Sequence, residues 1–426
     1  MLKFMFQKSN RHFMRFWWGQ MISQFGDRIN QMALIGLITL REPGSTLGLA
    51  KVLAFTIIPV FVIGPVAGVF VDRWDRAKVL FLCDIVRALL VLLIPWIFIR
   101  WESLIPLYII VFIIFTFSRF HVPAKMSIVP DLIEEKNLLM ANSMLTTTGM
   151  IAFAVGAAAG GFIVEIVGVK GGFFIDAATF LVSGLLILSI AKNRSFIVNR
   201  QELINTGREF VKLEKSFFQE FKEGLAYLFK QRDIRFVIST LFILFSAAGA
   251  VYVVIIIFVQ QAFHSLTRDL GILAVALGAG LFLGAVAYGR WGKNFKWYTT
   301  IFACLVLAGL MLNIFALVVY FYTSIIVAAA LAAVLGMVLG PVFIASNTIV
   351  HLVSDQEMRG KIFSSLEVVI HLAFLLAMMF SAWISEFIDR VWILTGIGVI
   401  FAVIGLIGLI RYKNGGKLAL IGEDVA

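Results

Sequence analysis

The chain is long, apolar and weakly charged: 61% of its 426 residues are hydrophobic and 14% are charged, and its mean hydropathy is +0.98. Soluble domains have about 45–50% apolar and about 25% charged residues, so this composition excludes a soluble core and predicts a polytopic membrane protein. A membrane span needs about 20 apolar residues, which leaves room for about twelve helices with their loops. The formal net charge of +11 would also suit a nucleic-acid-binding protein, a class that the distribution of the charges excludes below.

Hydropathy predicts twelve spans, six on each side of a polar stretch at 192–234. We therefore expect an all-α membrane protein with twelve transmembrane helices in two pseudo-symmetric six-helix bundles, 1–191 and 235–426. The connecting stretch 192–234 is a cytoplasmic linker, and apolar residues at helical spacing between 208 and 233 predict an amphipathic helix at the membrane surface. The expected spans are 15–39, 48–71, 79–99, 104–122, 140–165, 172–191, 235–259, 270–289, 298–321, 324–350, 363–385 and 391–411.

Basic residues gather in the loops on the side that carries both termini. Because positive loops stay in the cytoplasm, we expect both termini there, in a bacterial inner membrane. The positive charge is thus a signal of orientation and of contact with anionic lipids, and we expect no nucleic-acid partner. The opposite side holds only Arg41, Lys51, Arg100, Lys170, Arg268 and Arg390.

Motifs for covalent chemistry and cofactors are missing from the sequence. Cys83 and Cys304 lie in different apolar segments and form neither a disulfide framework nor a metal-ligand spacing. No G-x-x-x-x-G-K-[ST] sequence occurs, so we expect no ATP-driven step within this chain. Basic residues lead directly into the first span without a cleavage site, so no removable signal peptide is expected. We predict a protein that is not an enzyme and holds no cofactor or metal.

The first span carries a polar stripe along one helical face. Lipid cannot satisfy such a stripe, so it must face water, a ligand or another helix. Asp27 is the deepest acidic residue of the first half, and we hypothesise that it couples transport to protons or meets a cationic substrate. The alternative is an ion pair with Arg28 or another helix that only holds structure. The stripe consists of Gln20, Gln24, Asp27 and Gln31, with Asn30 beside it.

A charged run between the second and third spans predicts an ionic latch near the cytoplasmic side. The run contains Gly68, Asp72, Arg73, Arg76 and Lys78. Two further residues, Asp84 and Arg87, lie at i and i+3 in the third span. We expect Asp72, Arg73, Arg76, Asp84 and Arg87 to stabilise one transport state, so that breaking the latch shifts a conformational balance. The alternative is that these charges serve only to set the topology.

Two later spans carry other candidates. In the fifth span, Gly149, Gly156 and Gly160 have the spacing of small residues that allow close helix packing. In the eleventh span, Glu367 and His371 lie one helical turn apart and can share a proton. The alternatives are that Glu367 supports the preceding basic loop and that His371 bonds to a backbone carbonyl.

The run from Gly68 to Lys78 resembles the G-x-x-x-D-R-x-G-R-K signature of major facilitator superfamily transporters, with Asp75 in place of the second Gly. Further segments resemble the branch that holds macrolide-efflux and enterobactin-exporter proteins, and the resemblance covers nearly the whole chain. It implies two six-helix bundles around a central cavity that rock between inward-facing and outward-facing states. The segments that carry the branch resemblance start at Phe16, Arg119, Glu223 and Asp355.

These features together predict a secondary active transporter that works by alternating access. We expect proton-coupled efflux of a hydrophobic or amphipathic small molecule, drug-like or macrolide-like, by a monomer in contact with membrane lipids. Transport of a lysophospholipid, a siderophore or a metal ion on the same fold is the alternative within transport. A non-transporting membrane sensor or scaffold is the alternative of another class, which the short tail after Arg411 disfavours.

Overall fold

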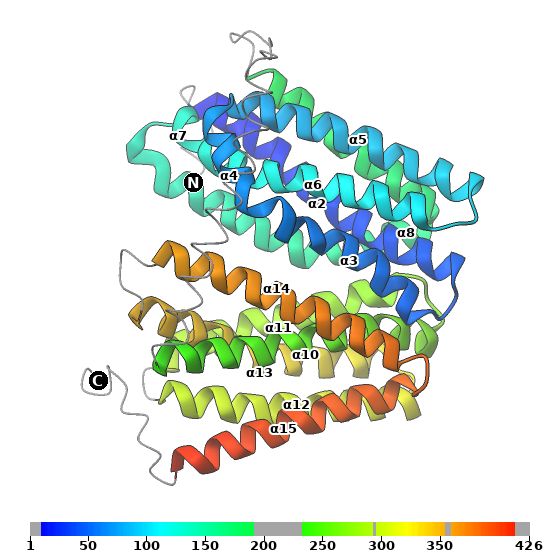
Figure 1. Cartoon of the computed structure of the whole chain (residues 1–426), viewed down its shortest axis with the longest axis vertical. Helices are drawn as coiled ribbons and strands as arrows, with labels where there is room; N and C mark the ends of the chain where they lie inside the picture. Colours follow the sequence, from blue (N-terminus) through cyan, green and yellow to red (C-terminus); the bar gives the residue numbers. More distant parts are fainter. Residues whose placement is uncertain (1–9, 191–231, 293–294, 354–358, 414–426) are drawn as a thin grey trace. The chain divides into compact units, whose positions relative to one another are not determined.

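A computed structural model describes residues 10–190, 232–292, 295–353 and 359–413 (Figure 1). Within these ranges the chain forms helices joined by short turns, and it forms no strand. The chain divides into two compact units: unit 1 comprises Met1–Arg41 and Lys51–Gln219, and unit 2 comprises Glu42–Ala50 and Glu220–Ala426. The amphipathic linker helix predicted at 208–233 lies outside the described residues, except for its last two positions.

The first half of the chain forms a set of long apolar helices, in which α2 packs against α8, and α5 packs against both α6 and α8. A short 3₁₀ turn at Glu135–Asn137 leads into α8. The helices are α2 (Arg11–Arg41), α3 (Thr46–Val62), α4 (Gly64–Arg73), α5 (Arg76–Arg100), α6 (Ile105–Ser127), α7 (Val129–Leu132) and α8 (Leu138–Leu188).

The second half repeats the pattern with six long helices, among which α11 packs on α13, α12 on α15, and α10 on α14. Nine helices of the described residues are long and apolar enough to cross a membrane; α2, which carries the polar stripe, and the 17-residue α3 are not among them. The helices of this half are α10 (Arg232–Phe263), α11 (Arg268–Trp291), α12 (Trp297–Phe321), α13 (Ile325–Val353), α14 (Arg359–Ile384) and α15 (Arg390–Lys413).

Helix α8 is two membrane helices joined by one residue. Its 51 residues run without a loop, but Gly168 leaves the helical conformation with φ 76° and ψ 167°. Only glycine adopts such a positive φ without a steric penalty, so Gly168 turns the chain between the spans predicted at 140–165 and 172–191. With α8 counted as two crossings and the α3–α4 pair as one, the described helices supply twelve, which confirms the predicted fold class.

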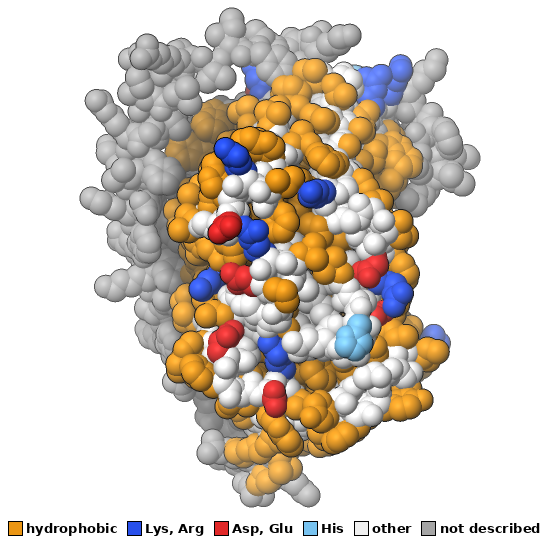
Figure 2. All heavy atoms as spheres, turned by 90° about the vertical axis from the view of Figure 1, so that its right-hand side faces the viewer, with side chains coloured by type: hydrophobic (Ala, Val, Ile, Leu, Met, Phe, Trp, Pro, Cys, Tyr) orange, Lys and Arg blue, Asp and Glu red, His pale blue; other side chains and the backbone are white. Residues whose placement is uncertain are grey.

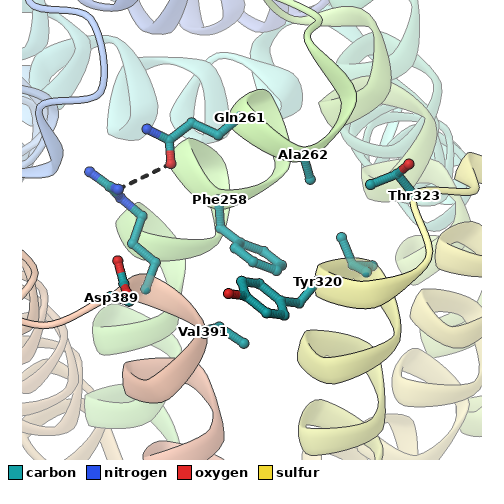
Figure 3. Close-up of a pocket in the computed structure, with 9 residues that line it drawn as sticks. Phe258, Gln261, Ala262, Tyr320, Thr323, Asp389 and Val391 are labelled. Carbon is teal, nitrogen blue, oxygen red and sulfur yellow. Dashed lines mark hydrogen bonds between the residues drawn. The ribbon is translucent and has the colours of Figure 1, made fainter.

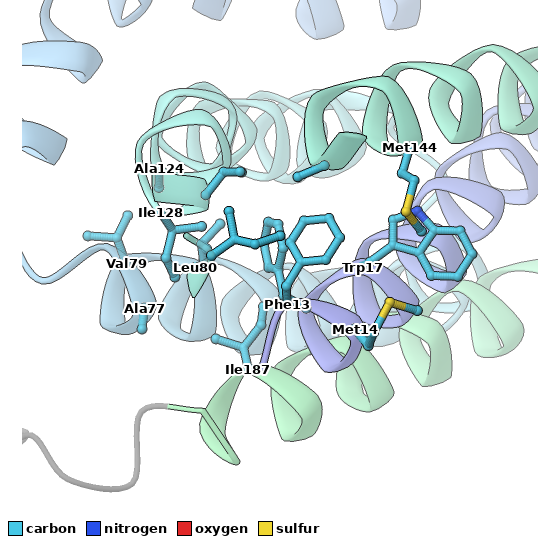
Figure 4. Packing of buried hydrophobic residues seen from close by; sticks show 14 of the residues in the cluster. Phe13, Met14, Trp17, Ala77, Val79, Leu80, Ala124, Ile128, Met144 and Ile187 are labelled. Carbon is cyan, nitrogen blue, oxygen red and sulfur yellow. The ribbon is translucent and has the colours of Figure 1, made fainter. Parts of the chain in front are cut away.

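The interior of unit 1 is filled by apolar side chains, the largest of them from α2, α5 and α8 (Figure 4). Phe13 and Phe16 of α2, Leu80 of α5 and Ile187 of α8 are fully buried. Lipid tails are as apolar as these side chains, so helix association in the membrane depends on close van der Waals packing rather than on water exclusion. The tight fit of these rings and branched chains therefore holds α2, α5 and α8 together.

In unit 2 the closest packing uses glycine instead. Gly280 and Gly284 of α11 face Gly336 and Gly340 of α13, and both pairs have the G-x-x-x-G spacing. A Cβ atom added at any of these four positions would meet backbone atoms of the opposite helix. The two backbones thus approach to direct contact, as small residues at this spacing allow in membranes.

Large hydrophobic side chains are widely exposed on the described surface. Leu139, Ile166, Phe321 and Ile326 each expose about four fifths of their surface. Figure 2 shows a face on which apolar side chains surround scattered basic and acidic ones, which are mixed rather than gathered by sign. Such extended apolar surface is typical of helices that face lipid.

Candidate functional site

A cluster of charged side chains is buried inside unit 1, between membrane helices. We call it the Arg87 cluster; its members are Asp27 of α2, Asp84 and Arg87 of α5, His121 of α6 and Ser183 of α8. The Arg87 guanidinium forms an ion pair with Asp84 one turn earlier, and its Nη1 atom lies 3.9 Å from Asp27 Oδ1. Charges inside a membrane are costly unless they pair, and such residues mark ion and substrate pathways.

Asp84 is the anchored carboxylate of the cluster. It is fully buried, accepts a 2.7 Å hydrogen bond from Ser183 Oγ, and lies 3.4 Å from His121 Nε2. On the other side, the Arg87 guanidinium lies 4.2 Å from the ring centroid of Phe180. Arg87 is therefore fixed by a carboxylate, an aromatic face and its own helix, in an almost completely buried position.

Asp27 is the loosely held carboxylate of the cluster. Its side chain is 43% exposed, whereas the side chain of Asp84 is 0% exposed. A separation of 3.9 Å is too long for a hydrogen bond. Loss of the charge on Asp27 would therefore leave Arg87 with its pair to Asp84 intact, so the geometry lets one carboxylate change its charge while the other stays fixed.

A second buried carboxyl lies close behind the stripe. Asp176 of α8 is fully buried, accepts a 2.6 Å hydrogen bond from Asn30 Nδ2, and lies 3.4 Å from Thr179 Oγ1. Gly26 of α2 makes room for it, because a Cβ atom there would overlap Thr179 and Asp176. Asn30 thus faces a neighbouring helix. Its partner Asp176 is not one of the candidates predicted from the sequence, although an acidic residue within an apolar span marks a candidate functional site.

The other stripe residues separate in the structure. Gln20 is buried, and its backbone oxygen accepts a 3.1 Å hydrogen bond from Gln24 Nε2. Gln31 Oε1 accepts a 3.0 Å hydrogen bond from Arg28 Nη1. Gln24 and Gln31 thus form hydrogen bonds within α2, and contact of the stripe with a ligand stays a prediction.

The members of the expected latch form two separate pairs. Arg76 Nη1 lies 2.8 Å from Asp131 Oδ2 at the surface, whereas Asp84 and Arg87 pair with each other inside the bundle. Among the described residues the two pairs do not contact each other. Asp75 caps the start of α5, accepting hydrogen bonds of 3.0 and 3.3 Å from the backbone nitrogens of the two residues after Arg76.

Four residues of the charged run remain: Gly68, Asp72, Arg73 and Lys78. The side chains of Asp72 and Arg73 lie outside the described residues, although their backbone forms the end of α4. Lys78 lies in the first turn of α5, where its backbone nitrogen serves the Asp75 cap. In the described part of the chain, a Cβ placed at Gly68 would meet no atom of another helix within 4 Å.

Glu367 and His371 both lie in α14 of unit 2. His371 Nδ1 lies 2.8 Å from the backbone oxygen of Glu367, one turn earlier, and the Glu367 side chain is exposed. This contact joins the ring to the backbone and not to the carboxylate. A shared proton between the two side chains stays a prediction.

A cavity of about 250 Å³ lies in unit 2 at the ends of α10, α12 and α15 (Figure 3). Phe258 and Tyr320 line it together with Asp389 and Arg390. The guanidinium of Arg390 is already occupied, since it donates 3.1 Å hydrogen bonds to Gln261 Oε1 and Thr46 Oγ1 and a third to the Gly44 backbone oxygen. The cavity therefore offers polar and apolar surface in similar measure.

A bundle of membrane helices with ion pairs buried between its members is typical of membrane transporters. Within the described ranges, no group of three His, Cys, Asp or Glu residues is placed to hold a metal ion. The chain belongs to the Major Facilitator Superfamily, whose family model matches residues 16–314. This confirms the family predicted from the charged run.

Similar proteins include exporters. The chain is 28% identical to the putative bacilysin exporter BacE of Bacillus subtilis, over 85% of this chain and 86% of that protein. It is 24% identical to macrolide efflux protein A of Streptococcus pyogenes, over 71% and 72% of the two chains, which confirms the resemblance to macrolide-efflux proteins. A solved bacterial homologue of the iron transporter ferroportin, in its inward-facing state, shares the fold with a TM-score of 0.70 at 13% identity, covering 95% of this chain and all of that one.

Proposed function

We propose that this protein is a secondary active exporter of hydrophobic or amphipathic small molecules, coupled to protons and working by alternating access. The observation that carries the proton-coupling part is the unequal pair of carboxylates on Arg87. Asp84 is buried and hydrogen-bonded, whereas Asp27 is half-exposed and 3.9 Å away. The names of the two exporters described above support the direction of transport and a drug-like or macrolide-like substrate.

In this mechanism Asp27 takes up and releases the proton. While Asp27 is ionised, it shares Arg87 with Asp84; when it is protonated, Arg87 relaxes toward Asp84 alone. The change alters the attraction between α2 and α5, which both belong to unit 1. A helix pair whose attraction depends on one proton is a two-state element that a proton gradient can bias.

We also propose a setting for the protein in the cell. It acts as a monomer in a bacterial inner membrane, with both termini in the cytoplasm, as the distribution of Lys and Arg indicates. It performs no covalent chemistry, and the charged run after the second span contributes to the balance between its two states.

Transport by purified protein in liposomes tests the proposal. A macrolide, a lipophilic cation and a lysophospholipid are supplied with and without a pH gradient, to wild type and to Asp27→Asn. We expect flux that the gradient accelerates in wild type and that loses this dependence in Asp27→Asn. Glu135→Gln serves as the control, because Glu135 is an exposed carboxylate in the turn before α8.

Two results would count against the proposal. Wild-type flux that ignores the pH gradient would remove proton coupling. Flux that keeps its pH dependence in Asp27→Asn would remove Asp27 from the mechanism and move the search to Glu367 and His371.

A further inference from the structure

Arg28 is a charged residue in the middle of α2 whose described hydrogen-bond and ring contacts are with neutral side chains. Its Nη1 atom donates a 3.0 Å hydrogen bond to Gln31 Oε1, and its guanidinium carbon lies 4.9 Å from the ring centroid of Phe153 in α8. In the described part of the chain, no Asp or Glu oxygen lies within 4.0 Å of this guanidinium. The residue is half-buried.

Arg28 lies too far from either end of α2 for its guanidinium to reach the polar membrane surface. At 1.5 Å per residue, Arg28 lies about 20 Å from Arg41 and about 25 Å from Arg11, the two ends of the helix. The hydrocarbon core is about 30 Å thick, so this cation lies deep within it. An arginine side chain reaches the interface only from positions near a helix end.

The neighbouring carboxylate, Asp27, attracts Arg28 electrostatically but forms no ion pair with it within 4.0 Å. Asp27 is adjacent in sequence, but adjacent side chains on a helix point about 100° apart. In the structure Asp27 turns toward Arg87 in α5, whereas Arg28 turns toward Phe153 in α8. The two charged side chains therefore point to different neighbouring helices of α2.

The seam between α2 and α8 is shaped around Arg28. A Cβ atom added at Gly156 would lie 3.0 Å from Arg28 Cγ, and one added at Gly149 would lie 3.3 Å from Gln24 Oε1. The glycines thus leave room for the polar edge of α2, while Phe153 between them keeps 56% of its surface exposed. We call this set the Arg28 notch: Gln24, Arg28, Gln31, Gly149, Phe153 and Gly156.

We infer that the Arg28 notch binds the carboxylate of an amphipathic substrate, with Phe153 against the apolar part of that molecule. The guanidinium presents a planar fork that matches a carboxylate with two parallel hydrogen bonds. One positive charge balances one carboxylate, whereas a phosphate dianion would leave a net charge in a medium of low dielectric. This inference rests on the proposed transport function and names a substrate class for it: amphipathic molecules with one free carboxylate.

Equilibrium binding to the full-length protein tests this inference. The probes are N-decanoylglycine and N-decanoylglycinamide, which differ only in the charge of one end. They are titrated into the protein in nanodiscs of zwitterionic lipid, and binding heat is measured. In wild type we expect the carboxylate to bind about 10- to 100-fold more tightly than the amide, the range of a charge-assisted hydrogen bond.

Variants separate charge recognition from folding. Arg28→Gln should bind both probes alike, with the affinity for the amide unchanged, and Arg28→Lys should keep part of the preference because it keeps the charge without the fork. Arg41→Gln is the matched control on the same helix, since Arg41 donates to the backbone oxygens of Trp101 and Glu102. It should behave like wild type.

Several outcomes would overturn the inference. These are equal binding of the two probes by wild type, no binding of either probe, or an equal loss of both in Arg28→Gln. Loss of the preference in nanodiscs that contain anionic phosphatidylglycerol would assign the notch to lipid instead. Carboxylate-selective binding without flux of N-decanoylglycine, or of the earlier cargos, in the liposome assay would overturn the proposed transport function and leave the binding site standing.

Discussion

Replacing Arg87 by leucine would leave a fully buried carboxylate, Asp84, without its cation. Breaking a buried pair by removal of one partner costs about 3–5 kcal/mol, and Asp84 has only Ser183 and His121 to offset the loss. The interaction of Arg87 with Asp27 should be much weaker. At 3.9 Å Coulomb's law gives about 4 kcal/mol at a dielectric constant near 20 but about 1 kcal/mol in water. Because the Asp27 side chain is 43% exposed, the lower value applies.

Double-mutant cycles measure both interactions in the same protein. The free energy of unfolding is obtained by denaturant titration in detergent micelles for Arg87→Leu, Asp84→Asn, Asp27→Asn and the two double variants. We expect a coupling energy of at least about 2 kcal/mol for Arg87 with Asp84, and no more than about 1 kcal/mol for Arg87 with Asp27. Equal couplings, or a larger one for Asp27, would refute the assignment of fixed and loose carboxylates.

Two other predictions concern packing and a buried hydrogen bond. Gly336→Leu should separate α11 from α13, because even a Cβ at that position meets the backbone oxygen of Leu277. A thermal melt of this variant should show a large loss of stability. The control Gly396→Ala, at an open position, should melt like wild type. Asn30→Ala should lower the free energy of unfolding by about 1–3 kcal/mol, since it removes the 2.6 Å hydrogen bond to buried Asp176. An Asn30→Ala protein that unfolds like wild type would show that this bond contributes nothing.

The membrane topology could be predicted from the sequence because hydropathy alone fixes where the chain can cross a bilayer. The division at 166–171 followed from two apolar runs, and Gly168 provides the turn between them. The sequence pattern could not show that α3 and α4 are separate helices broken near Ile63, because hydropathy continues across the break.

The sequence indicated the charged residues of the candidate site but not their partners on other helices. Asp27 and Arg87 stand out because charged residues are rare in apolar spans, but spacing along one helix says nothing about which other helix a side chain meets. Proximity in sequence suggested that Asp84 and Arg87 join the charged run after the second span. The structure instead pairs them with each other and places Arg87 3.9 Å from Asp27, on a helix about 60 residues earlier in the chain. The hydrogen bond from Asn30 to Asp176 joins residues 146 positions apart, so it could be found only once the fold was known.

The turn at Gly168 also bears on how the protein is made. Two membrane helices joined by one non-helical residue leave no loop between them, so the pair has little polar backbone to carry across the bilayer. Such a hairpin can enter the membrane as a single unit, with each helix shielding the other during synthesis. For the same reason, this turn is a poor place for an inserted epitope or protease site, since Gly168 alone joins the two helices.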